Sequence, residues 1–197
     1  MIQNKNDYLF YLECDKIALK INRKSPRIFG GDEVWVYQRL LRKAEYYTNC
    51  KPKCLLSYYY RRKLQRLSNR WGVYIPINVC EAGLSIVHLG PIHINSNSRI
   101  GENCRIQTGV TLGATDGLPD APEIGNNVFL SEGCKIIGGV KVADDCQIAA
   151  NAVVVKDIIE KGTTWGGVPA KKISASDSSK NLIRATEIVL SRGNSYE

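Results

Sequence analysis

Several features that mark large classes of proteins are missing from this 197-residue chain. It has no apolar run of about 18 residues, which argues against a membrane-spanning helix. Its first segment, M-I-Q-N-K-N-D-Y-L-F-Y-L-E-C, lacks the order of basic, apolar and small residues that marks a signal peptide. The seven cysteines are an odd number and include no CxxC pair. We therefore expect a cytoplasmic protein whose thiols are reduced.

Metal-binding side chains are also scarce. The chain has only two histidines, His88 and His93. Cys50 and Cys54 lie four residues apart, but no second pair or nearby histidine completes a set of zinc ligands. We therefore expect no metal site. The two histidines could be proton-transfer groups or packed side chains.

The net charge of +8 is concentrated in the first third of the chain. Residues 1–70 carry 16 Lys and Arg against 6 Asp and Glu, whereas residues 71–197 carry 11 against 13. This contrast indicates two structural units. The basic unit would attract an acidic glycan, an anionic membrane or a nucleic acid, but it has no nucleic-acid recognition motif and we expect no such partner. A solvated helical face explains the charge more simply, and membrane association stays open.

A period of six residues runs through the second half of the chain. Every sixth residue from 94 to 154 is Ile, Leu or Val, and the next residue is often small. Neither an α-helix nor an alternating strand has this period, but a parallel β-helix whose triangular coil takes three hexapeptides does. The aliphatic side chains would fill its axis, and Cys104, Cys134 and Cys146 would be small core residues. The eleven repeat positions are Ile94, Ile100, Ile106, Leu112, Leu118, Ile124, Leu130, Ile136, Val142, Ile148 and Val154.

The repeat divides the chain into three parts. We expect residues 1–72 to form a basic helical region, residues 73–173 to form the β-helix with a loop at 113–123, and residues 174–197 to form a C-terminal helix and tail. In the first part we expect a helix that starts at Asp32 and has Trp35, Leu40 and Leu41 at helical spacing.

The last part is expected to contain a helix at residues 176–191 that caps the solenoid. Its start is marked by Ser and Asp, and its apolar residues should be buried. These are Leu182, Ile183, Ile188 and Leu190.

The six-residue count is irregular in two places. Ile86 and Ile94 are eight residues apart, and the stretch between them contains both histidines. A regular side of the β-helix would not need the two additional residues. Such departures from local regularity are common at functional sites. Residues 113–123 keep the count but contain the Gly, Pro and Asp residues of a loop. We expect this loop to leave the wall and return in register.

Five motifs together resemble the hexapeptide-repeat acyltransferases, in particular the serine acetyltransferase-like branch. They lie within about residues 75–173 and read G-L-S-I-V-H-L-G, I-G-E-N-C-R-I-Q-T-G-V-T-L-G-A-T, I-G-N-N-V-F-L-S-E-G-C-K-I-I-G, N-A-V-V-V-K-D-I and G-G-V-P-A-K-K-I. The resemblance implies a mostly β protein built on a left-handed parallel β-helix, with the helical regions at its two ends. It also implies a homotrimer with active sites between subunits, and acetyl-CoA as the acyl donor.

The resemblance assigns His88 to the catalytic position of the family. Histidine titrates near neutral pH, so it could take the proton of an acceptor hydroxyl in a direct transfer without an acyl-enzyme. The alternative is a corner histidine with a purely structural role. His93 lies between two apolar residues and is expected to point outward, on the acceptor side. Glu81 is a candidate to orient His88, and Asp116 and Asp120 are further acceptor-side candidates.

The donor site also follows from the resemblance. Gly113, Ala114 and Thr115 are expected near the thioester and the pantetheine arm. The groove along later coils and the phosphate contacts involve further residues. These are Ser131, Ala149 and Ala150 for the groove, and Lys171 and Lys172 for the phosphates.

The chain departs from serine acetyltransferases where the acceptor would bind. The family has Asp directly before the catalytic histidine, where this chain has Val87, and another Asp where it has Val73. The family's Arg-His-Pro is replaced by D-G-L-P-D-A-P. We therefore expect a sugar hydroxyl of a surface polysaccharide or its precursor as acceptor. Serine O-acetylation and a catalytically silent trimeric scaffold are the alternatives. A zinc carbonic anhydrase of the same β-helix type is disfavoured, because it needs three histidine ligands per metal.

Overall fold

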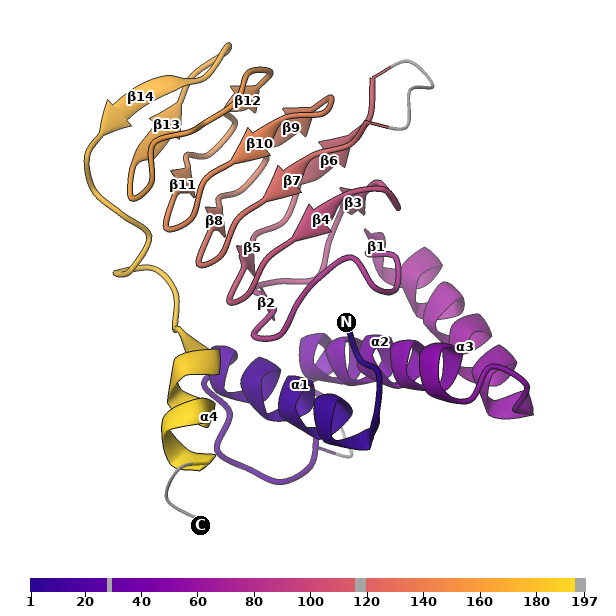
Figure 1. The fold of residues 1–197 in the computed structure, drawn as a ribbon. Helices are drawn as coiled ribbons and strands as arrows, with labels where there is room; N and C mark the ends of the chain where they lie inside the picture. Colours follow the sequence, from indigo (N-terminus) through magenta and orange to yellow (C-terminus); the bar gives the residue numbers. More distant parts are fainter. Residues whose placement is uncertain (28–29, 116–119, 194–197) are drawn as a thin grey trace.

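A triangular column of short strands is packed on a layer of helices in the computed structural model, which describes residues 1–27, 30–115 and 120–193 (Figure 1). Three helices form the layer at the lower end of the column, and a fourth packs beside the first of them. They are α1 (Lys5–Ala18), α2 (Glu33–Cys50), α3 (Leu55–Trp71) and α4 (Ala185–Gly193).

The described part of the chain contains fourteen strands of two to four residues. Each is short because a hexapeptide supplies one strand and then turns a corner. More described residues therefore lie in helices than in strands, so the expectation of a mostly β protein is wrong by residue count. The strands are β1 (Val73–Tyr74), β2 (Ser85–Ile86), β3 (Ile92–Ile94), β4 (Arg99–Ile100), β5 (Arg105–Ile106), β6 (Thr111–Gly113), β7 (Glu123–Ile124), β8 (Phe129–Leu130), β9 (Lys135–Ile137), β10 (Lys141–Val142), β11 (Gln147–Ile148), β12 (Val153–Val154), β13 (Thr164–Gly166) and β14 (Lys171–Ser174).

Three sheets form the sides of the column, which confirms the parallel β-helix. Sheet A contains β1, β3, β6, β9 and β12, and sheet B contains β4, β7 and β10. Sheet C contains β2, β5, β8, β11, β13 and β14. Neighbouring strands belong to successive coils and pair in parallel, apart from the antiparallel hairpin of β13 and β14 at the upper end.

The register of the sheets gives the length of each coil. Ile94 pairs with Leu112, which lies three hexapeptides further along the chain, as a regular coil requires. Leu112 pairs with Ile136, four hexapeptides further along, so the coil with the predicted loop is one hexapeptide longer and the wall continues in register. Ile86 pairs with Ile106, and this spacing exceeds three hexapeptides by two residues. The first coil is therefore two residues longer than a regular one.

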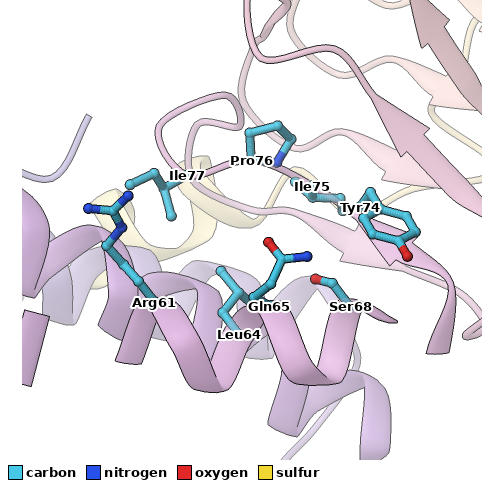
Figure 2. A pocket seen from close by; sticks show the side chains of 8 residues that line it. All are labelled: Arg61, Leu64, Gln65, Ser68, Tyr74, Ile75, Pro76 and Ile77. Carbon is cyan, nitrogen blue, oxygen red and sulfur yellow. The ribbon is translucent and has the colours of Figure 1, made fainter. Parts of the chain in front are cut away.

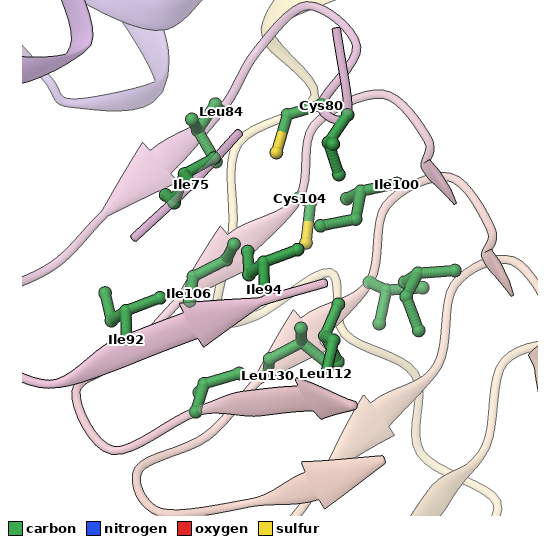
Figure 3. Close-up of a cluster of buried hydrophobic side chains, with 14 of the residues drawn as sticks. Ile75, Cys80, Leu84, Ile92, Ile94, Ile100, Cys104, Ile106, Leu112 and Leu130 are labelled. Carbon is green, nitrogen blue, oxygen red and sulfur yellow. The ribbon is translucent and has the colours of Figure 1, made fainter. Parts of the chain in front are cut away.

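Aliphatic side chains fill the axis of the column (Figure 3). Ten of the eleven predicted repeat positions are described, and each is at most 4% exposed, which confirms the period as the source of the core. Leu118 lies outside the described residues. Cys104, Cys134 and Cys146 are at most 1% exposed, so they are core residues as predicted.

Side chains of the helical layer close the lower end of the column. Arg42 is fully buried and donates to the Asp15 carboxylate at 2.8 Å and to the Glu81 carbonyl at 2.7 Å. Asp15 also accepts the backbone N–H groups of Gly83 and Leu84 at 3.0 and 2.9 Å. These backbone groups belong to the lowest coil, which has no coil beneath it, and the side chains satisfy their hydrogen bonds.

The helix predicted to start at Asp32 is confirmed. Asp32 is the N-cap of α2, and the predicted inward residues are buried. Trp35 is 1% exposed, Leu40 6% and Leu41 0%. Their side chains face the rest of the helical layer and the first coil, which positions the solenoid on the basic region.

The C-terminal helix differs from the prediction. It begins at Ala185 rather than near residue 176, and it packs against α1 at the lower end instead of capping the upper end (Figure 1). Leu190 is 60% exposed, and Leu182, Ile183 and Ile188 are only partly buried. The reason is that the preceding segment is held against the corner between sheets B and C. Ser178 donates to the Asn127 carbonyl, and Arg184 pairs with Asp145 at 2.7 Å.

Candidate active site

His88 lies at the corner where sheet C turns into sheet A. The backbone on both sides of this turn is fixed, because Val87 donates to the Ile106 carbonyl at 3.0 Å and Ile92 donates to the Gly72 carbonyl at 2.9 Å. The His88 side chain itself is exposed. Within the described ranges no hydrogen bond or ion pair holds its ring. The ring is therefore available to a ligand.

A glycine shapes the same turn. Gly90 has a φ of +152°, a conformation that residues with a Cβ rarely adopt. A Cβ placed there would also lie 3.0 Å from Cγ2 of Thr108 on the coil above. The two additional residues of the first coil are thus packed into a defined turn that presents His88.

Three of the residues predicted to bind CoA lie at the same corner, on higher coils. Ser131 follows β8, and Ala149 and Ala150 follow β11, both of which are strands of sheet C. The Ser131 N–H donates to the Ile148 carbonyl at 3.0 Å, so these coils stack directly. Ser131 is buried, Ala149 is partly buried and Ala150 is exposed. Small side chains at this corner would let an extended ligand approach the backbone.

The other predicted donor residues lie at a different corner. Gly113 ends β6 in sheet A, and Ala114 and Thr115 lead from it toward sheet B. A Cβ at Gly113 would lie 3.2 Å from Cδ1 of Ile137, so a larger residue would press on the next coil. Within one chain, residues 113–115 therefore lie at a different corner from His88.

The structure describes only one of the two loop aspartates that were predicted on the acceptor side. Asp116 lies outside the described residues. Asp120 is exposed and lies against Gly139, since a Cβ added to that glycine would be 3.0 Å from Cβ of Asp120. Asp120 thus belongs to the corner between sheets A and B, away from the His88 turn of the same chain.

His93 points outward from sheet A, as expected. It pairs in register with Tyr74, and the centroids of the two rings are 6.2 Å apart with an angle of 57° between the planes. Its backbone N–H donates to the Val110 carbonyl at 3.0 Å. Its role on the acceptor side stays a prediction.

Glu81 does not orient His88 within one chain. It lies at the corner between sheets B and C, whereas His88 lies at the corner between sheets C and A. Its carboxylate accepts the hydroxyl of Tyr11 and the amine of Met1, the latter at 2.9 Å. Burial alone would raise the pKa of Glu81, but these two hydrogen bonds hold it below its usual value. Glu81 connects the helical layer to the first coil.

The two predicted phosphate ligands lie on β14 at the upper end of the column. Both Lys171 and Lys172 are exposed. The ammonium of Lys172 lies 2.5 Å from a carboxylate oxygen of Glu160. In the described part of the chain Lys171 makes no ion pair, so it is the freer of the two to meet a phosphate.

A hollow that the sequence did not predict lies between α3 and the first coil (Figure 2). It encloses about 270 Å³. Tyr74, whose ring lies beside His93, forms one end of it. The basic charge of the region that contains α3 was visible in the sequence, but nothing in the sequence showed that this helix faces Tyr74. The lining residues are Arg61, Leu64, Gln65, Ser68, Tyr74, Ile75, Pro76 and Ile77.

Two further properties concern metals and membranes. Among the described residues, no group of three or more His, Cys, Asp or Glu side chains is arranged to hold a metal ion. None of the helices in the same residues is long and apolar enough to cross a membrane.

Known sequences match the repeat region. Residues 121–156 match the family model of the bacterial transferase hexapeptide (six repeats). The serine acetyltransferase of Helicobacter pylori strain J99 is 39% identical over 94 residues, which are 47% of this chain and 54% of the relative. The chain therefore spans about half the length of the curated relatives that it matches.

Solved structures match most of the chain. The serine acetyltransferase of Brucella abortus strain S19 has a TM-score of 0.73 and 23% identity, over 89% of this chain and 72% of that one. The complex of that enzyme with coenzyme A has a TM-score of 0.70 and 24% identity, over 87% and 70% of the two chains. At such identity the likeness shows the fold alone. The repeat region of the chain is therefore similar to the bacterial transferase hexapeptide family and to relatives named serine acetyltransferase, and most of the chain shares the fold of the Brucella enzyme.

Proposed function

We propose that the protein is an acetyl-CoA-dependent O-acetyltransferase in which His88 is the general base. The observation that carries the proposal is the exposed His88 in the turn that makes the first coil two residues longer, beneath Ser131 and Ala149. The names of the relatives support acetyl transfer, and the coenzyme A bound to a structural neighbour supports the donor.

The reaction would be a direct transfer. His88 accepts the proton of the acceptor hydroxyl while the hydroxyl oxygen attacks the carbonyl carbon of the thioester. The tetrahedral intermediate then expels the CoA thiolate as the carbon–sulfur bond breaks, and the imidazolium returns the proton to the sulfur. Backbone N–H groups near Gly113 of a neighbouring copy would stabilise the oxyanion.

Assembly into a homotrimer is part of the proposal. His88, Ser131 and Ala149 lie at one corner of the column, and residues 113–115 lie at another. Packing the first corner of one copy against the second corner of the next would unite them, with CoA between the subunits. The left-handed sense of the coil and the division at residues 72 and 173 belong to the same proposal.

L-Serine is the first candidate acceptor. The sequence relatives are named serine acetyltransferase, and the fold of the chain matches that of the Brucella enzyme over 89% of its length. Serine acetylation therefore has better support than the sugar acceptor expected from the sequence.

A sugar hydroxyl is the second candidate. It is favoured by the residues beside the base, because Val87 stands where the family has a carboxylate that holds the amino acid. In the structure Val87 is only partly buried and immediately precedes His88. An apolar side chain at this position cannot pair with the ammonium group of serine.

We also propose that the protein works in the cytoplasm. All seven cysteines are free, and five of them are buried. Free thiols in this number are typical of a reducing compartment.

The proposed function is tested by the release of CoA thiol from acetyl-CoA in the presence of serine or of a panel of sugars. We expect turnover with one acceptor class, and the rate with serine relative to sugars decides between the two candidates. If no acceptor supports turnover and calorimetry detects no binding of CoA, the protein is a catalytically silent scaffold and the proposal is wrong.

A further inference from the structure

The hollow between α3 and the first coil has an apolar floor and polar groups at its rim. Leu64 and Ile75 in the floor are 6% and 3% exposed. Figure 2 shows Arg61 and Tyr74 at opposite ends, with Gln65 between them. A pyranose ring needs this combination of an apolar surface, an aromatic ring and hydrogen-bonding side chains.

Two of the rim groups have no partner. In the described residues the exposed guanidinium of Arg61 makes no hydrogen bond or ion pair, and neither does the hydroxyl of Tyr74, a residue that is 40% exposed. Gln65 donates one amide hydrogen to Asn69 at 2.8 Å, which leaves its oxygen and its other hydrogen for a ligand.

Ser68 lines the hollow, but its hydroxyl hydrogen is already used in a hydrogen bond. The Tyr37 hydroxyl donates to the Val73 carbonyl at 2.9 Å, so the Ser68 hydroxyl must donate to the Tyr37 oxygen, 3.2 Å away. Arg61, Gln65 and Tyr74 are therefore the groups that can contact a ligand.

The charge around the hollow favours an anion. Residues 51–71 contain seven Lys and Arg and no Asp or Glu, and all seven are exposed. Among the described residues, no carboxylate lines the hollow. A guanidinium without a partner binds a carboxylate through paired, charge-assisted hydrogen bonds.

The position of the hollow connects it to the proposed active site. Tyr74 pairs in register with His93 and lies beside its ring, and the turn that holds His88 leads directly into the strand of His93. A saccharide with one residue in the hollow can extend across Tyr74 and His93 toward His88.

We propose that this hollow binds an acidic sugar residue of a saccharide acceptor, with the carboxylate on Arg61 and the ring against Tyr74. The inference rests on the proposed O-acetyl transfer with its second candidate acceptor, the sugar hydroxyl, and deepens it by naming an acidic saccharide as the class of acceptor. The hydroxyl that is acetylated would belong to a neighbouring sugar residue, which reaches His88.

Binding of D-glucuronate, measured by calorimetry or NMR titration without acetyl-CoA, tests the hollow directly. We expect D-glucuronate to bind more tightly than D-glucose. Arg61→Gln should weaken this binding at least about tenfold, the loss expected for a charge-assisted hydrogen bond. Arg62→Gln is the matched control, because Arg62 is the adjacent cation on α3 but lies outside the hollow and contacts the Tyr58 hydroxyl at 3.5 Å. Arg62→Gln should leave binding nearly unchanged.

Two outcomes would overturn the inference. One is an absence of D-glucuronate binding. The other is an equal loss in Arg61→Gln and Arg62→Gln, which would assign the attraction to the general charge of α3.

Turnover separates this inference from the proposed function. With an acidic disaccharide as acceptor, Arg61→Gln should raise KM for the acceptor and leave KM for acetyl-CoA unchanged. Acetylation of serine without any D-glucuronate binding would contradict saccharide binding in the hollow but support the proposed acetyl transfer. Arg61-dependent D-glucuronate binding without turnover on any acceptor would support saccharide binding in the hollow but contradict the proposed acetyl transfer.

Discussion

The side chain of Gln38 on α2 takes the place of a neighbouring strand beneath Ile86 on β2. Its amide oxygen accepts the Ile86 N–H at 2.9 Å, and its amide nitrogen donates to the Leu84 carbonyl at 2.7 Å. Gln38 is fully buried. Because β2 is the lowest strand of sheet C, these backbone groups have no coil below them. One glutamine therefore completes the sheet edge that leads to His88.

Gln38→Met should destabilise the protein by about 1–3 kcal/mol, because a buried N–H and a buried carbonyl lose their partner. Urea unfolding followed by circular dichroism measures the change. Gln3→Met is the control, since Gln3 is exposed, and its effect should stay within about 0.5 kcal/mol. Equal stability of the two variants would show that water or a shifted strand makes hydrogen bonds to the Ile86 N–H and the Leu84 carbonyl in place of Gln38.

His88→Ala should lower kcat about 10²–10⁴-fold, the usual effect of removing a general base. The fold should be retained, because the His88 side chain is exposed and makes no hydrogen bond or ion pair with the described residues that would hold the turn. The thiol-release assay gives the rate, and circular dichroism checks the fold. His93→Ala is the comparison and should affect KM for the acceptor more than kcat. A fully active His88→Ala with an inactive His93→Ala would reverse the two assignments.

Ala149→Leu should raise KM for acetyl-CoA several-fold with little change in stability. Ala149 lies above His88 at the corner between sheets C and A, and Gly166 follows on the next coil, where an added Cβ would lie 3.2 Å from Cβ of Ala149. Ala149 is partly exposed, and we expect the longer side chain of a leucine to extend from this corner into the proposed CoA groove. Ala143→Leu is the matched control at the corner between sheets B and C. Similar KM values for acetyl-CoA in both variants would show that CoA does not bind at the corner that holds Ala149.

Thiol reagents should distinguish the cysteines by burial. Burial raises the pKa of Cys14 and of Cys134 to about 12, so at pH 8 both thiols stay protonated and unreactive. Cys50 and Cys54 are partly exposed. We expect at most two thiols to react with a chromogenic disulfide in the native protein, and all seven in denaturant. Rapid labelling of Cys134 in the folded state would contradict the structure of the column.

The sequence was sufficient to predict the column. Its period is a direct product of local geometry, because each coil repeats the same inward positions and needs an aliphatic side chain at every one of them. Ile106, Leu130 and Ile148 lie one above another in sheet C for that reason. The longer first coil was visible as well, since the count from Ile86 to Ile94 has two residues too many.

Features that depend on contacts between distant segments could not be predicted. The start of α4 is set by the bonds of Ser178 and Arg184 to a corner that lies far away in the sequence. The hollow exists because α3 packs against β1 at an angle that no local pattern specifies. Glu81 was a candidate to orient His88, but in a triangular coil their separation in sequence places them at different corners.

The path of residues 175–193 also determines how the column can unfold. In a solenoid each coil contacts only its neighbours, so stability is ordinarily the sum of successive interfaces and the ends fray independently. Here the C-terminal segment bonds Asp145 and Asn127, Thr186 of α4 bonds Asn103 on a third coil, and α4 packs against α1. The last segment of the described chain therefore links the coils to one another and to the first helix, and the molecule should lose its structure in a single cooperative transition.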